Sequence, residues 1–503
     1  MSKQVRVRFA PSPTGPLHIG GVRTALFNYL FAKKNGGTFY LRIEDTDQNR
    51  FVSGAEAYIM EALEWLGIAP DETIGKNEKF GPYRQSERKH LYKEYADQLI
   101  NTGWAYYAFD TAEALDAQRK QHEEEGKTFI YNHTIREKLD TSLVISAEET
   151  AKRIAAGDAF VIRFKTPVNE TLHLHDIIRG DVKFETNLLD DKVLFKSDGM
   201  PTYHLANIVD DHLMETSHVI RGEEWLPSMP LHVLLYRAFG WEAPEFAHLP
   251  LILKPVGNGK LSKRDGDKLG FPVFPLEWKT EEGISSGYRE KGFFPEAVVN
   301  FLALLGWNDG TEKELYTLEE LVEAFDLKRV HKAGAKFDPE KNKWFNHQYL
   351  IQQKNEDLAK AFAPILTEKG FSTALEMTQI VKIVSLIKER AHFVSEFWEL
   401  SDFFFVAPQS YDEKASKNWK AETPALMQEL ITVLENIDDF TSVNIETIVK
   451  DWMTKNEIGM GKIMQPFRLS LVGALKGPHL FDIVELIGKE ETIQRIQKAI
   501  ETL

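Results

Sequence analysis

The spacing of hydrophobic residues changes once along this chain, near residue 290, and this change limits the folds open to it. Before that point, segments with the alternation of strands lie between segments with helical spacing, such as VRVRF (5–9) followed by VRTALFNYLFAKK (22–34). After it, nearly every patterned segment has helical spacing, from PEAVVNFLALLGW (295–307) to LMQELITVLENI (426–437). The sequence therefore predicts an α/β region followed by an all-helical half.

The composition narrows the class of protein. A chain of 503 residues is too long for one hydrophobic core, so we expect several domains. It has 0 cysteines, which excludes disulfides and thiolate metal sites. No apolar run reaches the roughly 20 residues that span a bilayer, and no secretory signal pattern is visible, so we predict a cytoplasmic protein without a membrane partner. The net charge of −15 argues against non-specific coating of nucleic acid but allows a local basic groove.

A histidine and two glycines, in PLHIGG (16–21), stand at the turn between the first predicted strand and the first predicted helix. Two prolines just before them end the strand. Free N–H groups at a helix start attract anions, and Gly20 and Gly21 carry no side chain that would keep a phosphate away. These residues indicate either an anion site that includes His18 or a structural turn without a ligand.

Three further clusters carry charge. RIEDTD (42–47) follows a predicted strand, and its three acids indicate either a metal site or a polar strand end. HVIRGEEW (218–225) combines an arginine with two acids and a tryptophan. LILKPVGNGKLSKRDG (251–266) places Lys260, Lys263 and Arg264 in a glycine-rich loop. This loop indicates either a mobile cationic clamp for a polyphosphate or a solvated surface.

Two segments have the spacing of a capping box, in which a Ser or Thr at a helix start and an acid three residues later bond to each other's backbone. Ser53 and Glu56 have this spacing, and so do Thr317 and Glu320. The sequence therefore predicts that helices begin at these two places.

Together the clusters resemble the signatures of class I aminoacyl-tRNA synthetases, with PLHIG in place of the HIGH motif and KLSKR in place of the KMSKS motif. RFAPSPTGPLHIGG, LRIEDTD, YHLANIVDD, VIRGEEW, KLSKR and KWFNHQYL are similar to segments of bacterial glutamyl-tRNA synthetases, in the same order. GKIMQPFRLSLVGALKGPHLFDIVELIGKE resembles the anticodon-binding domain of that family. The resemblance covers almost the whole chain. It implies ATP-dependent activation of L-glutamate to glutamyl-adenylate and transfer to the 3'-terminal adenosine of tRNA(Glu).

The resemblance also implies a multidomain fold with an α/β Rossmann-type catalytic domain, an α+β insertion and an all-α anticodon-binding half. The expected domains are a split catalytic domain at 1–86 and 205–249, an acceptor-stem-binding insertion at 87–204, a stem-contact region with the KLSKR loop at 250–345, and two anticodon-binding helical domains at 346–400 and 401–503. The segment at about 265–285 looks longer than is usual in the family, and we predict no function for it.

The resemblance assigns site residues in four groups. The catalytic group is His18, Lys260 and Lys263. The ATP-binding group is His18, Gly20, Glu224, Leu253, Lys260, Leu261, Ser262, Lys263 and Arg264. The glutamate-binding group is Arg8, Phe9, Ala10, Ser12, Glu44, Tyr203, Asn207 and Arg221. The anticodon group is Arg390, Arg468, Pro478, Leu480 and Phe481.

Within these groups, His18 would contact the ATP phosphates, and the two lysines would stabilise the departing pyrophosphate. Arg8, Tyr203 and Arg221 would bind the side-chain carboxylate of glutamate, because burying an unpaired charge is costly. Glu44 would bind the ammonium group, which would make the acidic cluster an amine site.

In the anticodon group, an arginine and an aromatic platform could read unstacked bases. Phe481 would stack on a base. In the other interpretation, Leu480 and Phe481 are core residues of a terminal helix. Arg390 is our candidate for discriminating the last anticodon base, which separates glutamate tRNAs from glutamine tRNAs.

The expected co-substrate is ATP with Mg²⁺, the expected partners are L-glutamate and tRNA(Glu), and the expected state is a monomer. Some family members bind zinc in the insertion, but Ala108, Asp110 and Ile135 stand where cysteines would be needed, so we expect no zinc. His173 and His175 alternate on one strand face without an evident third ligand, and we interpret them as ordinary strand residues.

Several alternatives remain open. A glutaminyl-tRNA synthetase shares the catalytic motifs but ends in β-barrels, whereas helical patterns here continue almost to Leu503. A non-discriminating glutamyl-tRNA synthetase would also charge tRNA for glutamine, and the sequence does not decide this. A nucleotidyltransferase would explain PLHIG but not VIRGEEW. A catalytically inactive tRNA-binding paralogue would not need His18 and both lysines.

Overall fold

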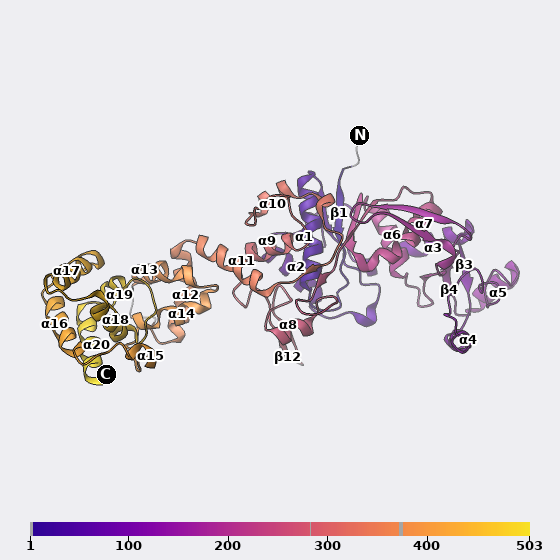
Figure 1. The fold of residues 1–503 in the computed structure, drawn as a ribbon. Coiled ribbons are helices and arrows are strands. Elements are labelled where there is room, and N and C mark those ends of the chain that lie inside the picture. Colours follow the sequence, from indigo (N-terminus) through magenta and orange to yellow (C-terminus); the bar gives the residue numbers. More distant parts are fainter. Residues whose placement is uncertain (1–3, 282, 372–375) are drawn as a thin grey trace. The chain divides into compact units, whose positions relative to one another are not determined.

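The computed structural model describes residues 4–281, 283–371 and 376–503. The chain forms two compact units, one of Met1–Lys291 with Pro295–Asn342, and one of Gly292–Phe294 with Lys343–Leu503 (Figure 1). No helix among the described residues is both long enough and apolar enough to cross a bilayer.

Parallel strands form the centre of the first unit. Strand β1 (Arg6–Phe9) pairs with β2 (Thr38–Leu41), and β8 (His218–Gly222) pairs with β9 (Glu245–Leu249), both in parallel register. The Ser217 N–H donates to Arg6 O at 2.9 Å, which places β8 beside β1. On the far side of β9 lies β5 (Thr171–Asp176), whose other neighbour is the antiparallel strand β6 (Gly180–Glu185). Two sheets built from strands far apart in the sequence, β1-β2 and β6-β5-β9-β8, thus lie side by side in a Rossmann-type domain, as predicted.

Helix α1 (Ile19–Lys34) connects β1 to β2 and fixes the position of the site. Ile19, Val22 and Leu26 are buried where the helix packs against the parallel strands and against α9 (Pro295–Leu304) and α10 (Leu318–Ala324). The first turn of α1 therefore lies at the carboxyl end of β1, which is where open α/β sheets bind ligands.

The other elements of this unit surround the parallel strands or form smaller sheets. A three-stranded antiparallel sheet has the order β3-β4-β7, and a core of apolar residues joins it to α3, α6 and α7. The bounds of these elements are α2 (Ala55–Trp65), α3 (Lys89–Asn101), β3 (Ala105–Ala108), α4 (Ala112–Glu124), α5 (Ala147–Ala156), β4 (Val161–Phe164), β7 (Val193–Phe195), α6 (Tyr203–Leu213), α7 (Met229–Phe239), β10 (Ile252–Leu253), α8 (Lys263–Leu269), β11 (Trp278–Thr280), β12 (Gly283–Ser285) and β13 (Ala335–Lys336).

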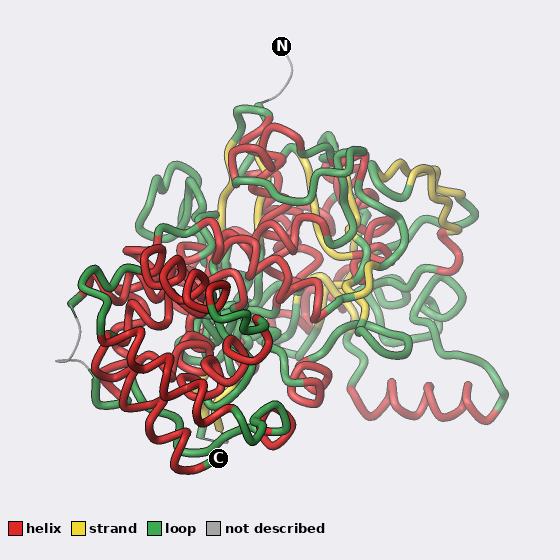
Figure 2. Tube along the Cα trace, turned by 60° about the vertical axis from the view of Figure 1, so that its left-hand side comes forward, coloured by secondary structure: helices red, strands yellow, loops and turns green. Residues whose placement is uncertain are grey.

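The second unit contains helices and no strand among its described residues (Figure 2). It has two hydrophobic cores, one around Phe362 and Ile387 and one around Leu430 and Phe467. Its helices are α12 (Asn355–Glu368), α13 (Met377–Ile387), α14 (Phe397–Ser401), α15 (Glu413–Ser416), α16 (Thr423–Glu435), α17 (Ser442–Lys455), α18 (Met460–Val472), α19 (Leu480–Ile487) and α20 (Lys489–Thr502), after α11 (Pro339–Gln352), which begins in the first unit. The predicted change to an all-helical half is confirmed.

The two predicted capping boxes have different outcomes. At Thr317 the prediction is confirmed, because its side chain accepts from the Glu320 N–H at 3.2 Å and Glu320 accepts from the Thr317 N–H at 2.9 Å. At Ser53 it is wrong. Helix α2 begins after Gly54, whose φ of 82° is left-handed, and Arg84 holds the Glu56 carboxylate at 2.7 and 2.9 Å.

Candidate active site

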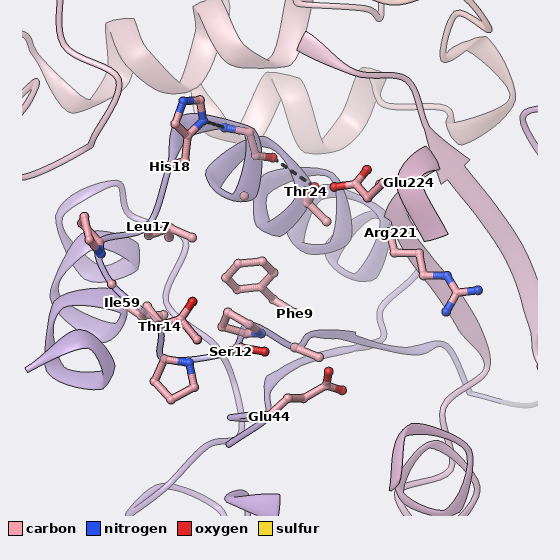
Figure 3. A pocket seen from close by; sticks show the side chains of 18 of the residues that line it. Phe9, Ser12, Thr14, Leu17, His18, Thr24, Glu44, Ile59, Arg221 and Glu224 are labelled. Carbon is pink, nitrogen blue, oxygen red and sulfur yellow. Dashed lines mark hydrogen bonds between the residues drawn. The ribbon is translucent and has the colours of Figure 1, made fainter. Parts of the chain in front are cut away.

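A cavity of about 830 Å³ lies at the carboxyl ends of β1 and β8, beside the first turn of α1 (Figure 3). All eight predicted glutamate-binding residues line it, and so do six of the nine predicted ATP-binding residues. The three that do not line it are Leu253, Ser262 and Arg264. His18 lies across the cavity from Glu44, so these two residues mark its two ends.

His18 forms the N-terminal cap of α1 at one end of the cavity. Its Nδ1 accepts a hydrogen bond from the Gly20 N–H at 3.1 Å, so the ring hydrogen is on Nε2. Nε2 is buried and has no hydrogen-bond partner among the described residues. Burial, and then the charge of Lys260, lower the pKa of His18 to about 4. The side chain is therefore a neutral donor beside a helix start.

Because its pKa is about 4, His18 should be neutral at every pH above about 5 and should not titrate between about pH 5.5 and 8. If it acted as an imidazolium, activity would fall as the pH rose through its ordinary pKa of about 6.5. We expect pH profiles of kcat/KM for ATP with the same shape in the wild type and in His18→Gln. An ionisation near 6.5 that only the wild type shows would contradict this assignment.

The cationic residues of KLSKR are more ordered than predicted. Lys263 and Arg264 lie not in a loop but in the first turn of α8, because Ser262 and Asp265 form a capping box there. Lys260 precedes this helix, and its Nζ lies 3.3 Å from Glu224 Oε1. Lys260 and Lys263 both line the cavity with exposed side chains. Two exposed ammonium groups thus flank the His18 end.

The segment for which we predicted no function forms a wall of the cavity. Phe274 packs edge-on against His18 with ring centroids 6.0 Å apart, and Trp278 packs in the same way against Tyr58 at 5.3 Å. The Tyr58 hydroxyl also donates to Leu276 O at 2.5 Å and accepts from the Leu276 N–H at 3.0 Å. Phe274, Trp278 and Thr280 line the cavity. The segment contains charged residues, but no motif in it marks it as part of a site.

The three acids of RIEDTD have three different roles. Glu44 is buried and lines the cavity. Asp45 accepts from the N–H and the hydroxyl of Ser86 at 2.8 and 2.6 Å, which is a structural role. Asp47 pairs with the exposed Arg50 at 2.7 Å at the rim of the cavity, which both residues line. Among the described residues, no group of three or more acidic or histidine side chains has the arrangement of a metal site.

Glu44 and Arg8 belong to a buried ionic network at the end of the cavity opposite His18. Arg42, which is 0% exposed, donates to Glu44 at 3.0 Å and to Asp211 at 2.8 Å. Arg8 donates to both oxygens of Asp211 at 3.0 and 3.1 Å, and Asn207 donates to Glu44 at 3.0 Å. Burial raises the pKa of Glu44 and Arg42 opposes that shift, whereas Arg8 and Arg42 overcome burial and lower the pKa of Asp211.

Sequence reasoning missed Arg42 and Asp211, although one signal for Asp211 was present. Tyr203, Asn207 and Asp211 recur at intervals of four in α6 and therefore share one helix face. Tyr203 and Asn207 were assigned to the site, so Asp211 could be expected on the same side of the helix.

Arg221 is the third buried arginine at this end, with 5% exposure. It donates to Tyr203 Oη at 3.1 Å, and its other bonds are to histidine nitrogens and a backbone carbonyl. Since Tyr203 accepts from Arg221, its own hydroxyl hydrogen is available to the cavity. Of these three guanidinium groups, those of Arg8 and Arg42 contact two carboxylates, Asp211 and Glu44, and that of Arg221 contacts none among the described residues. This end suits a small ligand with one more anionic group than cationic groups.

The positions at which we expected zinc ligands to be missing lie in or beside a small core. Ala108 and Ile135 are buried together with Tyr106 and Tyr131. Asp110 accepts from the Tyr131 hydroxyl at 2.6 Å. Apolar side chains therefore occupy this part of the insertion.

In the second unit, the structure contradicts part of the anticodon assignment. Leu480 and Phe481 are 4% and 2% exposed in the core around Phe467, so neither can stack on a base. Pro478 is also buried, and its carbonyl accepts from Arg468 at 2.8 Å. Burial, and then the charge of Arg390, lower the pKa of Arg468, which indicates that the two cations are close. The apolar pattern of α19 marks its core face and not a base-stacking surface.

Phe481→Leu should therefore leave tRNA recognition intact. The substitution keeps the position apolar but removes part of the ring, which should cost roughly 1–2 kcal/mol of folding stability, whereas loss of base stacking costs about 1–3 kcal/mol of binding. We expect kcat/KM for tRNA within about twofold of the wild type and a small loss of thermal stability. A selective fall of about 5- to 150-fold in kcat/KM for tRNA, with unchanged stability, would restore the stacking role.

Comparison with known proteins agrees with this geometry. Residues 4–344 match the family of class I tRNA synthetases (E and Q), catalytic domain, and residues 357–500 match an anticodon binding domain. The chain is 88% identical over 503 residues to a glutamate–tRNA ligase of Flavobacterium johnsoniae and 79% identical to one of Flavobacterium psychrophilum, with 100% of each chain covered. A crystal structure of a glutamate tRNA ligase from Elizabethkingia meningosepticum, in complex with its amino acid, matches with a TM-score of 0.96 at 55% identity and 100% coverage of both chains. The chain therefore belongs to the class I tRNA synthetases, and within them to the glutamate–tRNA ligases.

Proposed function

We propose that the cavity activates L-glutamate with ATP and that the chain passes the glutamyl group from the adenylate to the 3'-terminal adenosine of tRNA(Glu). The observation that carries this proposal is the pair of unlike ends. One end has an excess of buried positive charge, and the other has a neutral histidine donor and two exposed lysines.

Glutamate fits the first end by charge. Its two carboxylates and one ammonium group give it one more anionic group than cationic groups. Arg221 and Tyr203 would donate to the side-chain carboxylate, and Glu44, held by Arg42 and Asn207, would accept from the ammonium group. The α-carboxylate would then face the His18 end.

ATP, which would bring Mg²⁺ with it as co-substrate, fits the second end. The α-carboxylate would attack the α-phosphorus, forming an acyl–phosphate bond as the bond to the pyrophosphate oxygen breaks. No enzyme nucleophile is needed, because positioning and charge stabilisation supply the rate. His18 Nε2–H would donate to a phosphate oxygen, and Lys260 and Lys263 would neutralise the departing pyrophosphate.

The helical unit would read the anticodon of tRNA(Glu). Arg390 and Arg468 are the candidates that the structure leaves accessible in whole or in part. Phosphate contacts give affinity, whereas arginines at unstacked bases give sequence information. We further propose that the chain acts as a cytoplasmic monomer and that the five domains have the boundaries given above.

A pyrophosphate-exchange assay with each amino acid, with and without total tRNA, tests the reaction. We expect glutamate to support the fastest exchange when tRNA is present. Faster exchange with another amino acid under those conditions would overturn the proposal. Charging of purified tRNA(Gln) with glutamate, measured in parallel, would identify the non-discriminating alternative.

A further inference from the structure

The partners of Arg221 are neutral on every side. Its Nε donates to His248 Nε2 at 3.0 Å, its Nη1 lies 3.1 Å from His232 Nδ1 and from Tyr203 Oη, and its Nη2 donates to Trp225 O at 3.3 Å. It forms no ion pair with a carboxylate of the described residues. Buried arginines are ordinarily paired with carboxylates, so this arrangement needs an explanation.

The hydrogen-bond partners of the two histidines assign them opposite tautomers. His248 Nδ1 donates to Asp176 Oδ2 at 2.6 Å, which leaves a lone pair on Nε2 for Arg221. His232 accepts from Arg221 through Nδ1, so its hydrogen is on Nε2, which lies 3.1 Å from His204 Nδ1. Each ring thus carries its hydrogen on the side away from the arginine.

Asp176 is itself held in place at the end of β5. It accepts from the backbone N–H groups of Ile178 and Arg179 at 3.0 and 2.8 Å. The His248 ring lies between Asp176 and Arg221, so the carboxylate does not contact the guanidinium group directly. A carboxylate in direct contact would cancel the charge of Arg221 and repel an incoming carboxylate, whereas an imidazole accepts the hydrogen bond and leaves the charge.

The electrostatic surroundings keep both rings neutral. Burial, then Arg221, His204, Arg8 and His248, lower the pKa of His232 well below its ordinary value. Burial also lowers the pKa of His248, although Asp176 opposes the shift. An imidazolium at either place would lose its acceptor and add a like charge beside the guanidinium.

We propose that His232 and His248 are positioning residues, which hold Arg221 in place as an uncompensated cation for the side-chain carboxylate of glutamate. The proposal rests on the proposed function and explains how the site distinguishes a carboxylate from an amide. Neutral acceptors supply the geometry, and the substrate supplies the counter-charge.

A matched pair of variants at position 232 tests this. Asn and Leu have nearly the same shape, but His232→Asn keeps an acceptor at the δ position and His232→Leu does not. Both lose the contact with His204 equally. We expect the KM for glutamate to rise about 5- to 150-fold in His232→Leu, with little change in kcat, and to stay within about threefold in His232→Asn. An equal rise in both variants, or no rise in either, would overturn the proposal.

A second measurement is independent of activity. Nitrogen NMR of the full chain labelled at histidine should show His248 protonated at Nδ1 and His232 protonated at Nε2, with both neutral at pH 7. A cationic ring at either position would exclude the role. Failure of the proposed function would give a different result. The wild type would then show no pyrophosphate exchange with glutamate, while NMR would still show the two tautomers described above.

Discussion

Arg221→Gln should lower kcat/KM for glutamate by about 30- to 5,000-fold, the effect expected when one partner of a buried charge pair loses its charge. Arg221 is a buried cation without a carboxylate partner among the described residues, so in this variant glutamate would enter a site without the counter-charge for its side chain. Most of the loss should be in KM, and the KM for ATP should change little. Glutamine carries no side-chain charge, so the already low kcat/KM for glutamine should decrease less than that for glutamate. The preference for glutamate over glutamine should therefore become smaller.

Arg237→Gln is the matched control for this substitution. Arg237 pairs with Glu170 at 2.7 Å on the surface of the same unit, outside the cavity. The control should keep near wild-type kinetics, because exposed ion pairs contribute little. If Arg221→Gln left the KM for glutamate unchanged while folding normally, Arg221 would not bind the substrate.

Lys263→Ala should reduce the turnover of adenylate formation by about 10²–10³, the cost of removing one donor to charge that develops in the transition state. The side chain is exposed at the edge of the cavity, so water solvates it until charge moves to the pyrophosphate. Its contribution should therefore be to kcat, and the KM for glutamate should change by less than about threefold.

Lys268→Ala offers a control on the same helix. Lys268 is exposed in the last turn of α8 and does not line the cavity, so the substitution removes the same charge from the same element. Single-turnover measurements of adenylate formation should separate the two variants. Equal rates for both would mean that net charge, and not the position of Lys263, sets the rate.

The sequence predicted the residues that face the ligand better than the residues that hold them. His18, Glu44 and Arg221 each stand in a motif, and the structure brings all three to one cavity. His232 and His248 had no such signal, because a histidine within an apolar helix or strand looks like a core residue. Only the tertiary structure reveals that each ring meets the same guanidinium group.

Local patterns failed where a neighbour in space took over a residue's role. Glu56 has the spacing of a cap, but Arg84, far along the chain, holds its carboxylate. Phe481 follows a basic and proline-containing turn, but packing in the C-terminal core determines its orientation. Trp278 reaches the cavity because Tyr58 holds its segment, and no sequence pattern encodes that pairing.

Helix α8 is anchored at both ends, and this affects how Lys263 can act. Before the helix, the Leu261 N–H donates to Ile252 O at 2.9 Å, and after it, Val273 O accepts from the Ile19 N–H at 2.9 Å. Residues 262–272 form a short tether between these anchors. A short tether would confine the Lys263 ammonium group to a small volume and keep its effective concentration near bound phosphates high. If Lys263 acts as proposed, chain connectivity would contribute to turnover in addition to charge.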